Sequence, residues 1–409
     1  MNAPYSIPVK GITNIGQWIS WNPDSHKMEV REGGTWLINE GKFVEYLPQS
    51  FSDSGFLDAK GRLLTPGLVD SHTHPAFATT REDEFEMRAT GMSYQEIAKA
   101  GGGIRNSVRK LREISEADLS DLIFGRLRLM MEHGTTTVEC KSGYGLSTES
   151  ELKSLRAIHS ASNRLPIRTL STFLGAHEVP DEFQDNKTGY INLLIHEMIP
   201  KVAGDNLADF CDVFCEEGVF TVGETRKILE VAQAHGLELK FHADEFISTG
   251  GAELAAGIQA LSADHLMAIS EEGIRALAIS DTVATLLPGT TFFLGTGTWA
   301  PARKMLESGV TLALATDFNP GSNMSLSMSF IMTLAVIYLK MTSLEAFQAA
   351  TYGGAKALGL SDNTGAIAVG YTADAVIWSA FNYKQVPYYY GINQVAETVI
   401  QGNCILKRQ

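Results

Sequence analysis

Leu63-Leu64-Thr65-Pro66-Gly67-Leu68-Val69-Asp70-Ser71-His72-Thr73-His74 is the stretch that decides the fold. Its apolar residues predict a β-strand over 63–71, which ends in two histidines one residue apart. Side chains at positions i and i+2 of an extended chain point to the same side. His72 and His74 could therefore bind one divalent metal ion together. Two polar loop residues are the alternative interpretation, and the rest of the chain decides between the two.

The composition limits the classes of protein to which the chain can belong. Of its 409 residues, 44% are hydrophobic and 20% are charged, which is typical of a globular protein and argues against disorder. The net charge of −14 repels phosphate backbones, so we expect no nucleic-acid partner. The four cysteines predict buried thiols and no disulfide framework. Because neither a signal peptide nor a membrane-spanning apolar run is evident, we expect a soluble cytoplasmic protein with no membrane partner.

The alternation of β-like and helical segments predicts a barrel and a smaller β domain. Residues 63–360 contain helical patterns such as 118–133 and 222–235 between β-like runs. The expected strands are 63–71, 135–141, 167–174, 210–215, 237–242, 260–264, 283–287 and 311–316. Eight strands, most followed by a helix, predict a (β/α)8 TIM barrel of the α/β class. Residues 1–62 and 361–409 hold short β-like runs and predict one small β-sandwich domain built from both chain ends.

Polar side chains that could bind metal or substrate follow six of the expected strands. In a barrel of this kind such groups gather at the face where the strands end. The groups are His72 and His74 after strand one, Lys141 to Tyr144 after strand two, His177 after strand three, His242 to Glu245 after strand five, Asp264 and His265 after strand six, and Asp317 to Ser322 after strand eight. Each could be a structural polar residue by itself, but their repetition at one end of the barrel predicts a shared site.

The candidate metal ligands are His72, His74, His242 and Asp317. Three nitrogen donors and one oxygen donor suit zinc, iron(II) or manganese better than calcium or magnesium. A metal in a catalytic site lowers the pKa of a water molecule towards neutrality. A nearby proton acceptor is then required, and Glu245 lies three residues after His242. His265 could orient the water or carry protons. A surface carboxylate and a structural histidine are the alternative interpretations of these last two residues.

Two segments resemble the amidohydrolase superfamily. They are Asp58-Ala59-x-Gly61 followed by Pro66-Gly67-Leu68-Val69-Asp70-x-His72-x-His74, and Thr364-Gly365-Ala366-Ile367-Ala368-x-Gly370-x-x-Ala373-Asp374. The resemblance spans essentially the whole chain, including the split β domain. It implies a metal-dependent hydrolase that acts on a C–N bond in a ring, an amide or an amidine.

Five further blocks resemble the imidazolonepropionase family of that superfamily. They are Glu139–Leu146, Phe173–Pro180, His242–Phe246, Ser262–Leu266 and Ala315–Ser322. The resemblance implies that water opens the ring of 4-imidazolone-5-propanoate in histidine degradation and gives N-formimidoyl-L-glutamate. Two-metal members of the superfamily use a carboxylated lysine as a bridge, but Lys141 follows strand two, where such a bridge is not expected. One divalent ion, zinc or iron, is therefore favoured, and the ligand types do not separate the two metals.

The implied substrate carries a carboxylate tail, which requires a cation or several hydrogen-bond donors. Arg81, seven residues after His74, could bind the tail with both arms of its guanidinium group, and a surface arginine is the alternative. The other substrate-binding candidates are Tyr94, Tyr144, His177, Glu245, Asn319, Gly321 and Ser322. The catalytic candidates are Glu245 and His265 for deprotonating water, His177 for stabilising the tetrahedral oxyanion, and Asp317 for sharing the proton transfer.

Two other functions fit parts of this pattern. A deaminase of the same superfamily would use similar ligands and a glutamate after the strand-five histidine, but it would release ammonia. A metal-free barrel that serves as a scaffold or binding protein would typically lack one or more ligands, whereas this chain retains all four and Glu245. Arg81 and the segment 319–322 favour a carboxylate-bearing substrate. A homodimer is compatible with the sequence, but no pattern in it identifies the oligomeric state.

Overall fold

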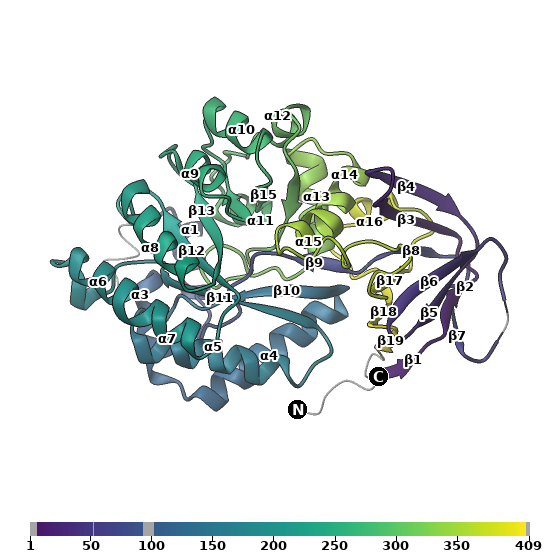
Figure 1. The fold of residues 1–409 in the computed structure, drawn as a ribbon, viewed down its shortest axis with the longest axis horizontal. Helices are drawn as coiled ribbons and strands as arrows, with labels where there is room; N and C mark the ends of the chain where they lie inside the picture. Colours follow the sequence, from purple (N-terminus) through teal and green to yellow (C-terminus); the bar gives the residue numbers. More distant parts are fainter. Residues whose placement is uncertain (1–5, 52, 93–101, 406–409) are drawn as a thin grey trace.

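Eight parallel strands form a nearly closed barrel in the computed structural model, which describes residues 6–51, 53–92 and 102–405 (Figure 1). Each strand pairs in parallel with the next strand along the chain. The (β/α)8 prediction is therefore confirmed. The barrel strands are β9 (Leu68–Asp70), β10 (Thr135–Lys141), β11 (Arg168–Ala176), β12 (Phe210–Cys215), β13 (Glu238–Ala243), β14 (Ser262–His265), β15 (Val283–Leu286) and β16 (Leu312–Leu314).

The segments that follow β9 and β16 meet at the seam of the barrel. Thr73 and Phe318 form a parallel bridge there. The backbone N–H of Asp317 donates to the carbonyl oxygen of His72 at 2.9 Å, and that of His74 donates to the carbonyl oxygen of Phe318 at 2.9 Å. The predicted ligands at the first and last strand ends are therefore brought together by backbone hydrogen bonds.

Helices connect the strands and cover the outside of the barrel (Figure 1). The predicted helices over 118–133 and 222–235 correspond to α4 and α8. Thr221 and Glu224 form a capping box at the start of α8, which satisfies backbone N–H groups of its first turn. The helical segments are α1 (Glu82–Ala89), α3 (Ile104–Glu113), α4 (Glu116–Glu132), α5 (Thr148–Ser162), η1 (Asp181–Phe183), α6 (Lys187–Leu193), η2 (Leu194–Met198), α7 (Ile199–Gly204), α8 (Val222–Ala234), α9 (Gly251–Gly257), α10 (Glu271–Ala278), α11 (Pro288–Leu294), α12 (Ala302–Glu307), α13 (Met328–Tyr338), α14 (Ser343–Gln348), η3 (Ala349–Gly353), α15 (Gly354–Lys356) and α16 (Gln385–Tyr388).

Gly67 divides the predicted first strand into two strands of different sheets. Before it, β8 (Leu63–Pro66) pairs with strands of the small domain, and after it β9 joins the barrel. One barrel strand over 63–71 was therefore a wrong prediction. The Gly67 backbone packs directly against the side chain of Thr136 on β10, since a Cβ on Gly67 would lie 2.1 Å from the Thr136 hydroxyl oxygen, and the Gly67 N–H donates to the carbonyl of Asp374 beside β17 at 2.9 Å.

Both ends of the chain build the small β domain, as predicted. Its two sheets share an apolar core that includes Ile12, Trp18, Trp36, Phe43 and Ile377. The division at residues 62 and 360 stays a prediction, although sheet membership changes at Gly67. The seven-stranded sheet has the order β1 (Ser6–Pro8), β19 (Asn403–Ile405), β18 (Val395–Ile400), β17 (Ala375–Trp378), β8, β3 (Gln17–Asn22) and β4 (Lys27–Glu32), and the four-stranded sheet has the order β6 (Lys42–Leu47), β5 (Thr35–Asn39), β2 (Gly11–Thr13) and β7 (Phe56–Asp58).

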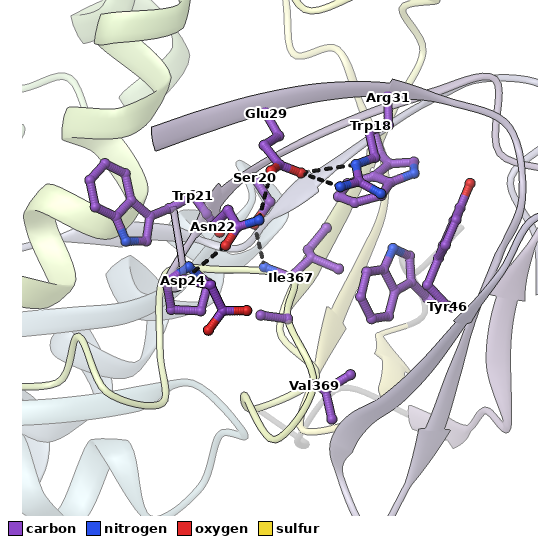
Figure 2. Close-up of a pocket in the computed structure, with 13 residues that line it drawn as sticks. Trp18, Ser20, Trp21, Asn22, Asp24, Glu29, Arg31, Tyr46, Ile367 and Val369 are labelled. Carbon is purple, nitrogen blue, oxygen red and sulfur yellow. Dashed lines mark hydrogen bonds and ion pairs between the residues drawn. The ribbon is translucent and has the colours of Figure 1, made fainter. Parts of the chain in front are cut away.

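A pocket of about 260 Å³ lies in the small domain (Figure 2). Trp18, Trp36 and Tyr46 line it, and the carboxylate of Glu29 pairs with the guanidinium of Arg31 at 2.8 Å beside them. None of the lining residues belongs to the predicted metal or substrate set. This pocket is therefore distinct from the candidate site. Within the described ranges, no helix is long and apolar enough to span a membrane.

The buried carboxyl of Asp374, which precedes β17, gives a stability prediction. Burial raises its pKa from 3.8 to about 6. Because the folded state binds this proton more tightly than the unfolded chain, its contribution to the free energy of unfolding falls as pH rises from 3.8 to about 6, by about 3 kcal/mol. Asp374→Asn is expected to remove this loss and to be the more stable protein at about pH 8.

Urea unfolding from about pH 4 to about pH 8 measures this effect. Asp24→Asn, at an exposed carboxylate of the same domain, is the matched control and is expected to follow the wild type. An Asp374→Asn protein whose stability falls with pH as steeply as that of the wild type between about pH 4 and about pH 6 would contradict the prediction.

Candidate metal centre and active site

The four predicted metal ligands lie together at the carboxyl face of the barrel, and His265 joins them. Nε2 of His72 lies 3.2 Å from Nε2 of His74, and these two atoms lie 3.5 Å and 3.4 Å from Oδ1 of Asp317. His242 and His265 each place a ring nitrogen within 4.8 Å of a nitrogen of His72. All five side chains are buried. Four imidazoles and one carboxylate thus form a single buried cluster.

The chemistry of this cluster fits a divalent metal ion. Nδ1 of His72 donates to Oδ2 of Asp264 at 2.6 Å, so its Nε2 carries a lone pair. Burial lowers the pKa of His74 to about 4 and that of His265 to about 3, so these rings are neutral at neutral pH. Neutral imidazole nitrogens that converge beside a carboxylate are the donors that zinc and iron(II) prefer.

Two carboxylates hold two of these histidines: Asp264, which the sequence placed at a strand end without a specific role, and Asp212, which it did not single out. Oδ2 of Asp264 accepts a hydrogen bond from Nδ1 of His72, and Oδ1 of Asp212 lies 3.0 Å from Nδ1 of His242. Such partners fix the orientation of metal-binding histidines. Asp212 lies in the apolar run of β12, and a charged residue in a buried strand was the signal that could have identified it.

Asp317 directs one oxygen towards the histidines and the other towards two hydroxyl groups. Oδ2 accepts hydrogen bonds from the hydroxyl of Thr290 at 2.5 Å and that of Ser322 at 3.2 Å. Burial alone would raise the pKa of Asp317, but the hydrogen bond with His74, the charge that His265 carries once it is protonated at low pH, and the hydroxyl of Thr290 hold it well below its usual value. Thr290 follows β15, one of the two strand ends for which the sequence offered no candidate.

Glu245 lies beside the cluster with its carboxyl buried. Its Oε1 is 3.6 Å from Nδ1 of His265. The backbone N–H groups of Glu245 and Phe246 donate to Oε2 of Glu216 at 3.1 and 3.0 Å, which fixes this turn. Burial, followed by the charges of Asp317 and Glu216, raises the pKa of Glu245 well above its usual value. A carboxyl with a raised pKa suits proton exchange near neutral pH.

His177 and Tyr144 lie on the His74 side of the cluster. The ring of His177 stacks on His74 with centroids 5.2 Å apart, and the ring of Tyr144 lies 5.4 Å from that of His177. Because the carbonyl oxygen of Gly143 can only accept, Nδ1 of His177 must donate to it at 2.9 Å, which leaves Nε2 as an acceptor. Burial lowers the pKa of His177 well below its usual value, so this neutral form persists. The geometry therefore disfavours the predicted donation to an oxyanion.

The guanidinium group of Arg81 lies against the segment 319–322. A Cβ on Gly321 would lie 2.5 Å from Nη1 of Arg81, so the guanidinium occupies space that a side chain at position 321 would need. Nη2 of Arg81 pairs with Glu84 at 2.5 Å, while its buried Nε has no partner among the described residues. The guanidinium therefore retains a buried donor that a substrate carboxylate could use.

The side-chain amide of Asn319 is engaged within its own loop, and its predicted contact with substrate stays a prediction. Its Oδ1 accepts from the N–H groups of Gly321 and Ser322 at 2.8 Å each, and its Nδ2 donates to the Ser322 hydroxyl at 2.6 Å and the Asp317 carbonyl at 2.8 Å. The amide thereby uses all its hydrogen-bonding positions within the loop. Asn319 holds the loop beneath Arg81 in shape. Tyr94 lies outside the described residues.

Comparison with known proteins identifies the family. Residues 63–405 match the amidohydrolase family. The chain is 46% identical over 388 residues to the imidazolonepropionase of Geobacillus thermodenitrificans (strain NG80-2), an alignment that covers 93% of this chain and 91% of the relative. It is 42% identical to the Bacillus velezensis imidazolonepropionase, with 97% of each chain covered. The chain belongs to the imidazolonepropionase family. The predicted family and the predicted enzyme class, a hydrolase of the amidohydrolase type, are confirmed.

Superposition on solved structures confirms the fold of this imidazolonepropionase family chain. A triazine hydrolase variant superposes with a TM-score of 0.78 at 17% identity and covers 97% of this chain and 94% of its own. An adenosine deaminase from Xanthomonas campestris with bound zinc superposes with a TM-score of 0.72 at 19% identity, with 98% and 96% covered. At these identities the likeness concerns the fold alone. The roles of the individual site residues stay predictions.

Proposed function

We propose that the chain opens the ring of 4-imidazolone-5-propanoate with water and releases N-formimidoyl-L-glutamate, with one zinc or iron ion held by His72, His74, His242 and Asp317. The observation that carries this proposal is the position of Arg81 against Gly321, four residues after Asp317. A buried guanidinium that pairs with Glu84 but keeps a donor without a partner among the described residues suits a substrate that carries a carboxylate. The family shared with curated imidazolonepropionases supports the same substrate.

Glu245 exchanges the protons of the proposed reaction. When bound, a divalent ion would lower the pKa of a coordinated water molecule and polarise the ring carbonyl. Glu245 accepts a proton from the water that attacks this carbonyl, and His265, at 3.6 Å from Glu245, orients the exchange. The carbonyl–nitrogen bond then breaks, and the proton held by Glu245 goes to the departing ring nitrogen. Asp317 keeps Oδ1 towards the ligand histidines because Thr290 and Ser322 occupy Oδ2.

Arg81 binds the propanoate carboxylate in this proposal. Gly321 leaves room for the guanidinium group. Ser322, the next residue in the chain, offers a hydroxyl group. His177 accepts a hydrogen bond from a ring N–H of the substrate through Nε2, which replaces the oxyanion contact predicted from the sequence. Tyr144 closes the His74 side of the site, and Tyr94 remains a predicted substrate contact. A cytoplasmic homodimer also remains a prediction.

Product analysis tests the proposed function. The metal-loaded protein is incubated with freshly prepared 4-imidazolone-5-propanoate, and the loss of ultraviolet absorbance, N-formimidoylglutamate and ammonia are measured. We expect formimidoylglutamate without ammonia, and no turnover after treatment with a chelator. Release of ammonia would favour the deaminase alternative. No turnover by folded, metal-loaded protein would rule out this substrate.

Thr290→Val tests the hydroxyl contact that the sequence did not reveal. A hydrogen bond to a charged group contributes about 1.5–3 kcal/mol, so its loss is expected to lower kcat/KM about tenfold or more. The adjacent variant Thr291→Val is the matched control, because Thr291 is buried in the same helix, α11, and has no hydrogen bond to Asp317. Equal kcat/KM values for the two variants would contradict the role of Thr290.

A further inference from the structure

Two lysines lie fully buried inside the barrel, next to the carboxylates that hold the ligand histidines. Lys141 ends β10, and Lys240 lies on β13 two residues before His242. Lysine is seldom buried completely unless its ammonium group is paired. The partners of these two ammonium groups lead to two of the proposed metal ligands.

The first chain of contacts runs from Lys141 through Asp212 to His242. The Lys141 ammonium lies 2.7 Å from Oδ2 of Asp212 and 2.6 Å from a carboxylate oxygen of Glu139. The other oxygen of Asp212 is 3.0 Å from Nδ1 of His242 and accepts the backbone N–H of the same residue at 3.1 Å. Each oxygen of Asp212 therefore has its own partner, so the plane of the carboxylate is fixed.

The second chain runs from Lys240 through Asp264 to His72. The Lys240 ammonium lies 3.8 Å from Oδ2 of Asp264 and donates to the hydroxyl of Ser262 at 2.7 Å. The same Oδ2 is 2.6 Å from Nδ1 of His72, while Oδ1 of Asp264 has no partner in the described part of the chain. In this chain, Oδ2 of Asp264 faces both Lys240 and His72, and its distance to the Lys240 ammonium is longer than its distance to His72.

We propose that Lys141 and Lys240 are positioning residues, each of which holds the aspartate that orients one metal-binding imidazole. A carboxylate can only accept, so each aspartate makes Nδ1 of its histidine the donor and leaves Nε2 for the ion. Without the ammonium group, the aspartate loses the contact that fixes its rotamer. Since Lys141 makes the shorter contact and leaves an oxygen of Asp212 free for His242, it contributes more than Lys240. The inference rests on the ligand set of the proposed function.

Zinc affinity tests the inference without relying on catalysis. Metal-free Lys141→Met and Lys240→Met proteins are titrated with Zn²⁺ against a chromophoric chelator. Loss of a residue that supports a metal ligand typically weakens metal binding about 10–100-fold. We expect the dissociation constant for Zn²⁺ to rise by a factor in that range in Lys141→Met and by a smaller factor in Lys240→Met. Lys153→Met is the matched control, because its ammonium binds carbonyls of Leu111, Arg112 and Ile114 outside the barrel, and its zinc affinity should equal that of the wild type.

Folded Lys141→Met and Lys240→Met proteins with the zinc affinity of Lys153→Met would overturn the inference. If a lysine variant does not fold, ¹⁵N-histidine spectra of the metal-free wild type decide, with signals assigned through His72→Gln and His242→Gln. Protons on Nδ1 of both rings are expected, and protons on Nε2 would contradict the inference. Zinc binding that depends on both lysines in a protein without ring-opening activity would overturn the proposed substrate and leave this inference standing.

Discussion

Glu245→Gln is expected to lower kcat about 10²–10⁴-fold, the range that a positioned proton-transfer group contributes. Glutamine keeps the size of the side chain but cannot take a proton from water. Glu245 is buried 3.6 Å from His265, and its turn is fixed by hydrogen bonds to Glu216, so the substitution should leave the fold intact. Zinc affinity should change little, because the carboxyl of Glu245 does not belong to the buried cluster of candidate metal ligands.

Steady-state kinetics with 4-imidazolone-5-propanoate and a Zn²⁺ titration measure both parts of this prediction. Glu253→Gln is the matched control, since Glu253 lies in α9 and accepts a hydrogen bond from Ser270 away from the cluster. Its kcat should equal that of the wild type. If Glu245→Gln kept kcat within about tenfold of the wild type, the prediction would be wrong, and His265 or Asp317 would be the proton acceptor instead.

Local patterns were enough to predict the barrel and the residues at its strand ends. His72 and His74 follow one strand and Asp317 follows the last, and a closed parallel barrel brings these ends together whatever the details of packing. The chemistry of a metal site then limits which side chains can meet there. This is why the ligand cluster, including His242, appears in the structure where the sequence placed it.

Contacts between individual side chains of different strand ends could not be predicted in the same way. Asp264 reaches His72 across 192 positions of the chain, and Thr290 reaches Asp317 from a helix start that carries no motif. The change of sheet at Gly67 was also not predicted from periodicity, because the apolar run continues through this residue without interruption. The donor direction of His177 is fixed by one carbonyl oxygen, that of Gly143, which no residue pattern encodes.

Arg81→Met is expected to lower kcat/KM about 10²–10³-fold, mainly by raising KM, because a buried carboxylate that loses its charged partner costs about 2–5 kcal/mol. Methionine preserves an unbranched chain beside Gly321 but removes every donor. The Nη1 group near Gly321 is the donor that a propanoate tail would engage, while the buried Nε, on the Nη2 side of the guanidinium, has no partner among the described residues. The surface variant Arg105→Met, whose guanidinium pairs with Asp181, is the matched control.

A substrate analogue that lacks the charge separates this role from a loss of folding. The methyl ester of the propanoate should be a poor substrate for the wild type, and Arg81→Met should process it about as well as the wild type does, because the missing contact is the same one. Glu84 loses its partner in this variant, so Glu84→Gln is measured beside it to show what that ion pair contributes. If Arg81→Met lowered kcat/KM equally for the acid and the ester, Arg81 would support the loop and not bind the tail. The position of Arg81 would then no longer favour a carboxylate-bearing substrate over the substrate of a deaminase.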